Sequence, residues 1–293
     1  MANAYDIITE RIIAKLEAGV CPWRKPWAGT QQIPTNLVSG KPYRGINIWM
    51  LHMSGYASPF WLTYKQAAQL GGTVKSGEKG TPVIFWLWNH KPVAPKADET
   101  DDAVAQKSAP MVRYYTVFNV EQCAGLPVSP ASDTQNPDTH IDAIDNCEAV
   151  VKAMQNPPTI NHGSGIACYR PSSDVISMPD RAKFTSAEEY YSTLFHELTH
   201  STGHASRLNR KTLTDICPFG STNYSKEELV AEMGAAYLCG ITGIADRTID
   251  NSAAYLHGWL QKLKADNRLI IQAAAQAQKA ADLILGCSYK AEE

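Results

Sequence analysis

The stretch Phe195-His196-Glu197-Leu198-Thr199-His200 indicates the fold of the C-terminal half of the chain. Side chains four residues apart lie on one face of a helix, so His196 and His200 can offer two imidazole nitrogens to one metal ion. Glu197 can then reach a water molecule on that ion, where a metallopeptidase places its general base. A capping-box pattern over residues 186–189 predicts that the helix begins just upstream. The stretch therefore predicts a metal-binding helix.

Two histidines leave a catalytic zinc site incomplete, because such a site has three protein ligands and one position open to water. The metzincin pattern would place its third histidine where this sequence has Ser206, so that class is excluded. His204 is eight residues beyond His196, a rise of about 12 Å along one helix, and this is too far for the two to share an ion. We therefore expect a carboxylate from a second helix.

The stretch 224–232, Tyr-Ser-Lys-Glu-Glu-Leu-Val-Ala-Glu, offers that carboxylate. Glu228 and Glu232 lie one helical turn apart on the same face. We predict Glu228 as the third ligand. Because Ser225 and Glu228 also form a capping-box pattern, Glu232 is the alternative ligand.

The composition is that of an ordinary globular protein, with 293 residues, 44% of them hydrophobic and 19% charged. No apolar run approaches the ~18–20 residues of a membrane span, and the N-terminus lacks the basic start and apolar core of a signal peptide. The seven cysteines include no C-x-x-C pair, so neither a disulfide framework nor a zinc ribbon is indicated. We expect a cytoplasmic protein with no membrane partner.

A polar, proline-rich stretch over 127–139 predicts a linker between two domains. We expect an N-terminal domain over 1–126 and a C-terminal domain over 140–293. Residues 91–110 are rich in Ala, Lys, Asp and Pro, and we interpret them as a flexible insertion.

Hydrophobic periodicity and breakers predict helices and strands in both domains, so the expected fold class is α+β. The predicted helices are 4–18, 61–70, 140–155, 252–264 and 267–285. The predicted strands are a pair over 82–88 and 113–120 and an edge strand over 167–178, beside the metal-binding helix.

The two halves differ in charge: residues 1–127 contain 13 Lys and Arg against 9 Asp and Glu, a net charge of +4, within a chain of net −2. Aromatic and basic side chains alternate there in loop-like sequence, as expected of a protein that stacks on unpaired bases and contacts phosphates. The plain alternative is that the tryptophans are core residues. The predicted DNA contacts are Trp23, Arg24, Lys25, Trp27, Tyr43, Arg44, Lys65, Lys75 and Lys79.

Several short sequence blocks occur in one order along nearly the whole chain. They are Pro22-Trp23 with Pro26-Trp27, Pro42 to Asn47, Trp61 to Gln66, Gly77 to Gly80, Tyr115 to Val120, His196 to His200, Thr202 to His204 and Glu227 to Glu232. Together they resemble the ArdC family of plasmid antirestriction proteins, whose N-terminal domain also occurs at the front of some plasmid DNA primases. No primase motif follows that domain here, so priming is not expected.

The resemblance implies an N-terminal domain that binds single-stranded DNA and a C-terminal zincin-like metallopeptidase domain, mainly helical with a small sheet. It also implies protection of incoming plasmid DNA from host restriction during conjugation. His196, Glu197 and His200 match the metal-binding motif of the family. Glu228 to Glu232 resembles the acidic helix of thermolysin-type gluzincins, which implies that Glu228 binds metal and Glu232 orients a ligand histidine.

We therefore expect a Zn²⁺ ion, or another divalent metal, with Glu197 as general base and a peptide substrate such as the host restriction enzyme or another protein. Tyr169 and Tyr224 are candidates for stabilising the oxyanion. Two alternatives remain open from the sequence. The protein could act by binding DNA or the restriction enzyme alone, with a structural metal site, or it could be a general cytosolic peptidase with no role on DNA.

Overall fold

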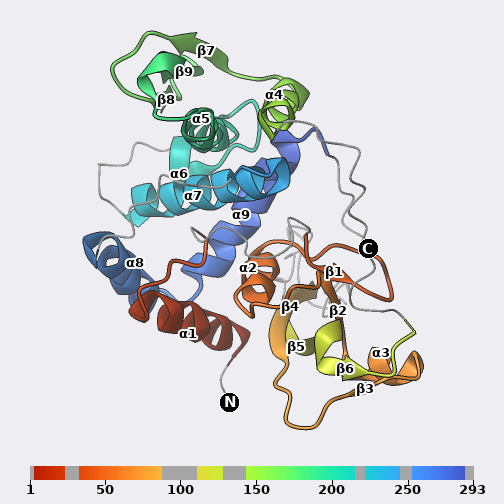
Figure 1. Cartoon of the computed structure of the whole chain (residues 1–293). Helices are drawn as coiled ribbons and strands as arrows, with labels where there is room; N and C mark the ends of the chain where they lie inside the picture. Colours follow the sequence, from red (N-terminus) through yellow and green to blue (C-terminus); the bar gives the residue numbers. More distant parts are fainter. Residues whose placement is uncertain are drawn as a thin grey trace, which may run out of the picture.

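The structure, a computed structural model, describes residues 3–23, 33–87, 111–127, 143–214, 222–244 and 253–287. It has the expected α+β class, with one group of strands at each end of the molecule and helices between them (Figure 1). The predicted insertion over 91–110 lies outside the described residues, and so does the predicted linker after residue 127. No helix among the described residues is both long enough and apolar enough to span a bilayer.

The N-terminal part contains a four-stranded sheet in the order β1-β2-β5-β4. Its strands are β1 (Thr35–Asn36), β2 (Phe60–Leu62), β4 (Thr81–Leu87) and β5 (Met111–Asn119). The predicted pairing of β4 with β5 is confirmed: the two are antiparallel, with Val83 opposite Tyr115. A second, two-stranded sheet joins β3 (Thr73–Val74) to β6 (Cys123–Ala124), with the short helix η1 (Val120–Gln122) just before β6.

The described residues of this part include three α-helices: α1 (Ala4–Glu17), α2 (Ile46–His52) and α3 (Tyr64–Gln69). The helix predicted over 61–70 is shorter than expected, because Trp61 pairs with β5 in the sheet. Thr63 then caps the helix: its hydroxyl accepts a hydrogen bond from the backbone N–H of Gln66, at 3.2 Å. Pairing within the sheet therefore overrides the helical pattern at the start of this segment.

The C-terminal part is a helical bundle with a small three-stranded sheet. The helices are α4 (Ala143–Ala153), η2 (Arg181–Lys183), α5 (Ala187–Ser201), α6 (Lys211–Thr214), α7 (Thr222–Thr242), α8 (Ala253–Ala265) and α9 (Leu269–Ile284). The strands are β7 (Thr159–His162), β8 (Cys168–Arg170) and β9 (Val175–Met178).

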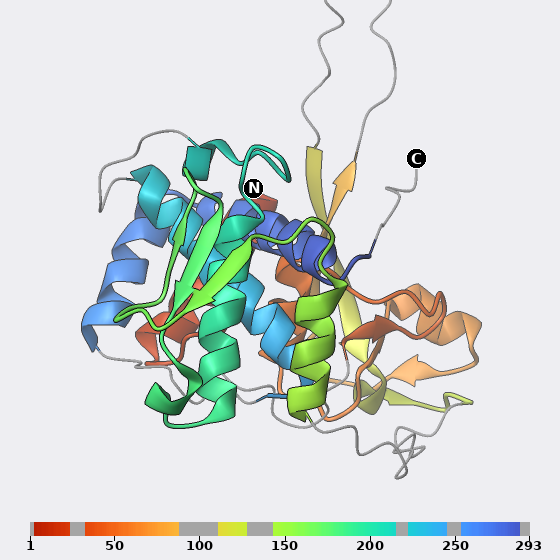
Figure 2. The same ribbon diagram turned by 90° about the horizontal axis from the view of Figure 1, so that it is seen from above.

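The single edge strand predicted over 167–178 is wrong in detail. The segment forms two antiparallel strands, and β9 is the central strand of the sheet because β7 pairs with its other edge in parallel. The sheet lies beside α5, as expected (Figure 2).

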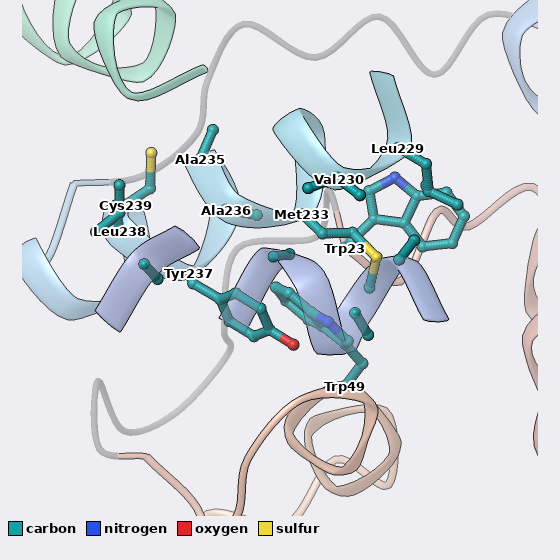
Figure 3. Close-up of a cluster of buried hydrophobic side chains, with 14 of the residues drawn as sticks. Trp23, Trp49, Leu229, Val230, Met233, Ala235, Ala236, Tyr237, Leu238 and Cys239 are labelled. Carbon is teal, nitrogen blue, oxygen red and sulfur yellow. The ribbon is translucent and has the colours of Figure 1, made fainter. Parts of the chain in front are cut away.

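One hydrophobic core joins the two parts of the chain. Helix α9 packs against α7 and α5 and also against α1 and α2. The Trp49 ring of α2 stacks on Tyr237 of α7, with centroids 4.7 Å apart (Figure 3). Trp23 meets Trp259 of α8 edge-on, with centroids 6.1 Å apart. The N-terminal part therefore helps to bury the helix that carries the predicted carboxylate ligands.

Candidate metal centre

Helix α5 presents the two histidines as the sequence predicts. Ser186 caps the helix by accepting a hydrogen bond from the backbone N–H of Glu189, so His196 and His200 lie in its later turns. Their Nε2 atoms are 3.1 Å apart. Two nitrogens bound to one zinc ion at tetrahedral angles lie about 3.3 Å apart, so this pair fits a shared ion with little rearrangement.

Helix α7 brings Glu228 to the same point. One carboxylate oxygen of Glu228 lies 3.6 Å from Nε2 of His196, and the other lies 3.5 Å from Nε2 of His200. Among the described residues, these three form the group of His, Cys, Asp or Glu side chains whose donor atoms could hold one metal ion, all within 4.8 Å of one another. Because α7 begins at Thr222, Ser225 and Glu228 lie inside the helix, and the capping-box interpretation is wrong.

The site is open to solvent on one side. The side chains of His196 and Glu228 are 27% and 29% exposed, whereas His200 is 11% exposed. Glu197 is buried beside His196. Two nitrogens and one carboxylate with an accessible side match the donor set of zinc sites that keep a position open to water.

The acidic groups and His196 shift one another's pKa values. Burial disfavours the charged imidazole of His196, but its hydrogen bond to Glu228 and the charges of Glu197, Glu228 and Glu232 outweigh burial, and the pKa of His196 is raised. Burial opposes ionisation of Glu228 as well, but the two histidines outweigh it, and the pKa of Glu228 is lowered. The carboxylate is therefore ionised, as a metal ligand must be.

Glu227 lies behind the site, in a role that the sequence does not predict. Its side chain is 4% exposed, and one of its oxygens lies 3.4 Å from Nδ1 of His200. The guanidinium of Arg210 donates to the same carboxylate. Because a ligand histidine is oriented by the partner of its other ring nitrogen, Glu227 holds Nε2 of His200 towards the site. The only sequence signal is its position directly before Glu228.

Glu232 has different contacts from those expected. Its carboxylate accepts hydrogen bonds from Nε1 of Trp23, at 3.0 Å, and from the hydroxyl of Tyr255. The contact that orients a ligand histidine, predicted for Glu232, is made at His200 by Glu227. Glu232 is also outside the group of donor atoms that could hold the ion.

The two tyrosines considered for the oxyanion lie in different surroundings. Tyr169 donates to Asp174 at 2.8 Å and accepts from Arg207, so its hydroxyl is already engaged. Tyr224 donates to Glu228, and burial together with that carboxylate raises the pKa of Tyr224. Tyr224 is therefore the candidate that lies at the site.

Several of the predicted DNA contacts are not accessible to a nucleic acid. Trp23 and Tyr43 are 1% and 7% exposed, so the expectation of accessible rings in a loop is wrong for both. Each ring lies in a hydrophobic cluster. Arg44 forms an ion pair with Asp282 of α9.

The remaining predicted contacts are either exposed or not described. Arg24, Lys25 and Trp27 lie outside the described residues. Three lysines of the set have exposed side chains. Lys65 lies on α3, Lys75 follows β3, and Lys79 comes shortly before β4.

Comparisons with known proteins agree with this architecture. A family model described as the N-terminal domain of anti-restriction factor ArdC matches residues 2–118, and one described as a zincin-like metallopeptidase matches residues 145–276. The metal-free crystal structure of the antirestriction protein ArdC from plasmid R388 has 39% sequence identity, covers 97% of both chains and gives a TM-score of 0.71. The chain belongs to the ArdC family of antirestriction proteins.

The comparisons also found a second structure of the R388 protein and relatives of different lengths. The R388 protein also has a Mn(II)-bound structure, 40% identical to this chain with a TM-score of 0.71. The uncharacterized protein y4eC of Sinorhizobium fredii (strain NBRC 101917 / NGR234) is 34% identical over 96% of this chain and 91% of its own length. Two Escherichia coli proteins described as DNA primase TraC are 39% and 37% identical, but this chain spans only 27% and 20% of their lengths.

Proposed function

We propose that this ArdC-family chain binds single-stranded DNA in the cytoplasm, protects incoming plasmid DNA from host restriction during conjugation, and has a metal-dependent peptidase site. The peptidase part rests on one observation, the meeting of donor atoms from His196, His200 and Glu228 beside Glu197. The DNA part is supported by the match to the ArdC N-terminal domain and by the similarity to primases. The protein substrate would be the host restriction enzyme or another protein.

The residues of the site have different roles in peptide hydrolysis. His196, His200 and Glu228 would hold Zn²⁺ or another divalent ion, which supplies Lewis-acid activation of water and of the peptide carbonyl. Glu197 accepts the proton of the attacking water and passes it to the leaving amine. Glu227 and Arg210 keep the ring of His200 in position. The hydroxyl of Tyr224 donates to Glu228 in this structure, and it would turn from that carboxylate to donate to the developing oxyanion.

Replacing Glu197 tests its proposed role as the general base. The Glu197→Gln protein should bind Zn²⁺ or Mn²⁺ like the wild type, because Glu197 is not a ligand, and should lose at least about 100-fold in the rate of peptide cleavage. Cleavage is measured on an unfolded protein substrate, and metal binding by isothermal titration calorimetry. Glu188→Gln makes the same change about 14 Å away along α5 and should leave both values unchanged. Equal cleavage by Glu197→Gln and the wild type would rule out the peptidase mechanism.

An assay of DNA protection distinguishes protection by proteolysis from protection by DNA binding alone. If cleavage by the protein is what defeats restriction, Glu197→Gln should fail to protect transferred plasmid DNA while still binding single-stranded DNA. If Glu197→Gln protects as well as the wild type, DNA binding is sufficient and the metal site has another purpose. A protein that shows no salt-dependent binding to an oligonucleotide would instead be a peptidase with no role on DNA.

A further inference from the structure

The N-terminal part exposes aromatic side chains that differ from those predicted to contact DNA. Tyr64 is 63% exposed and Tyr114 is 47% exposed, whereas Trp23 is 1% exposed. An aromatic ring can stack on a base only where its face is accessible. Tyr115 of β5 and Phe60 of β2 are less exposed, at 37% and 36%. The two most exposed aromatic side chains of the described residues therefore lie on α3 and β5, where stacking on a base is most readily available.

Four side chains of α3 and β5 are here called the aromatic row: Tyr64, Phe118, Thr116 and Tyr114. The last three alternate along β5 and therefore point to one face of the sheet, with neighbours roughly 7 Å apart. Tyr64 of α3 meets the ring of Phe118 edge-on, with centroids 6.4 Å apart. Helix α3 also contacts β5.

Gly80 leaves the middle of the aromatic row uncovered. A Cβ atom at this position would lie 2.2 Å from Cγ2 of Thr116 and 3.0 Å from Cζ of Phe118. Contacts this short force the neighbouring side chains to move, so a larger residue at position 80 would displace Thr116 and Phe118. The absence of a side chain at residue 80, just before β4, therefore leaves room for the side chains of Thr116 and Phe118.

The charge around the aromatic row is positive. The described residues 33–87 and 111–127 contain six Lys and Arg against two Glu, a net charge of +4, or +3 when Arg44, which is paired with Asp282 of α9, is left out. Both acidic side chains are engaged by neighbours: Glu78 accepts from the amide of Gln122, and Glu121 accepts from the backbone N–H of Ser58.

Two lysines flank the row directly. Lys65 follows Tyr64 on α3, and Lys79 precedes Gly80. Both side chains are exposed, and neither makes an ion pair with another described residue. They can therefore reach the phosphates of a strand whose bases lie on the row.

We infer that the aromatic row is the surface on which unpaired bases of single-stranded DNA stack, with Lys65 and Lys79 at the phosphates. This rests on the proposed DNA binding and names its site. A single strand fits because its base faces are free to stack on the rings, whereas those of a duplex are covered by neighbouring bases. The cationic surroundings match the negative backbone of such a strand.

The test measures binding of the full chain to a fluorescent oligodeoxythymidylate by anisotropy, at several salt concentrations. Replacing both Tyr64 and Tyr114 with Ala should lower the affinity at least tenfold, because two stacking faces are lost. Replacing both with Phe should keep the affinity within about twofold, because Phe retains the face. Ile166→Ala removes another exposed apolar side chain, from the C-terminal part, and should change nothing.

The lysines are tested through the salt dependence. Each phosphate contact contributes about 0.7 to the slope of log affinity against log salt for a single strand, so Lys65→Ala with Lys79→Ala should reduce that slope by about 1.4. Lys183→Ala, an exposed lysine of η2, should leave the slope unchanged.

The outcomes separate this inference from the proposed function. If the wild type does not bind the oligonucleotide, the proposed DNA binding itself fails. If the wild type binds and the double Ala variant, with an unchanged far-UV spectrum, binds equally well, DNA binding stands and the aromatic row is the wrong surface. Equal loss for a duplex would also overturn the inference, because stacking on unpaired bases predicts loss for the single strand alone.

Discussion

Arg210 and Glu227 form a buried ion pair behind His200. Both side chains are 4% exposed, and Arg210 also donates to the hydroxyl of Thr202 and the carbonyl oxygen of Thr199. Burial alone would raise the pKa of Glu227, but His200 and Arg210 lower it to about 2. The carboxylate that orients His200 is therefore ionised across the working pH range.

Replacing Arg210 should show how much protein stability and metal binding depend on this ion pair. Arg210→Ala leaves a buried carboxylate without its cation, which typically costs about 3–5 kcal/mol. We expect that loss in urea unfolding, together with weaker Mn²⁺ binding as His200 loses its fixed orientation. Lys264→Ala breaks an ion pair with Glu17 in which both side chains are about half exposed, and should cost at most about 1 kcal/mol. Equal losses in the two variants would show that the buried pair has no special role.

His52, the last residue of α2, should give the protein a pH-dependent stability. Burial lowers the pKa of His52 to about 4, from 6.5. The unfolded chain then binds this proton more readily, so stability is fully present above pH 6.5 and falls as the pH drops towards 4, by up to about 3 kcal/mol. Urea unfolding at pH 7 and pH 5 should show a smaller difference for His52→Gln than for the wild type. The exposed His257 is the control, and an unchanged difference in His52→Gln would contradict the assignment.

The closeness of α5 and α7 brings the ligands of the site together. Gly234 of α7 faces Thr199 of α5, and a Cβ at position 234 would lie 2.4 Å from Cγ2 of Thr199. Since His200 follows Thr199 on α5, any separation of the helices also separates His200 from Glu228. The glycine is required by packing between helices rather than by its backbone conformation.

A methyl group at this contact should act on both stability and metal binding. Gly234→Ala should destabilise the protein by about 1–3 kcal/mol through overpacking, and it should weaken Mn²⁺ binding. A Cβ at Gly258 of α8 would meet no described atom within 4 Å, so Gly258→Ala should stabilise by up to about 1 kcal/mol. Thermal unfolding and titration calorimetry measure both effects. A stabilised Gly234→Ala protein would show that α5 and α7 can accommodate a methyl group at this contact.

Local signals predict elements well where neighbouring residues decide the structure. Ser186 and the histidine spacing place α5 and both imidazoles, because capping and helical periodicity are local. The local pattern wrongly includes Trp61 in a helix, because its strand is decided by distant β5. The Ser225 signal is misleading for a related reason: α7 begins before it and is held by packing against α5 and α9. The roles of Glu227 and Arg210 depend on a fold that brings separate segments together.

At the scale of the whole molecule, the two parts of the chain share a core. The rings of Trp23 and Trp49 are buried against helices α7 and α8, far along the sequence (Figure 3). This explains why the sequence wrongly indicates Trp23 as a DNA contact: a tryptophan in a polar, proline-rich segment is expected to be exposed until the partner surface is known. Its hydrogen bond to Glu232 also ties the N-terminal part to the helix that carries Glu228.

The shared core predicts that the protein unfolds as one unit. Urea unfolding followed by tryptophan fluorescence and by far-UV circular dichroism should give coincident transitions. Trp49→Ala should shift both transitions equally, with a loss of about 3–5 kcal/mol. Two separate transitions, with only one of them moved by Trp49→Ala, would show that the parts fold independently.

A crystal structure of the protein loaded with Mn²⁺ or Zn²⁺, with the ion located by its anomalous signal, tests the proposed site most directly. We predict one ion bound by Nε2 of His196, Nε2 of His200 and a carboxylate oxygen of Glu228 at about 2.0–2.2 Å, with a further position open to water. An ion held by Glu232 in place of Glu228, or enclosed by four protein atoms, would contradict the proposed peptidase site.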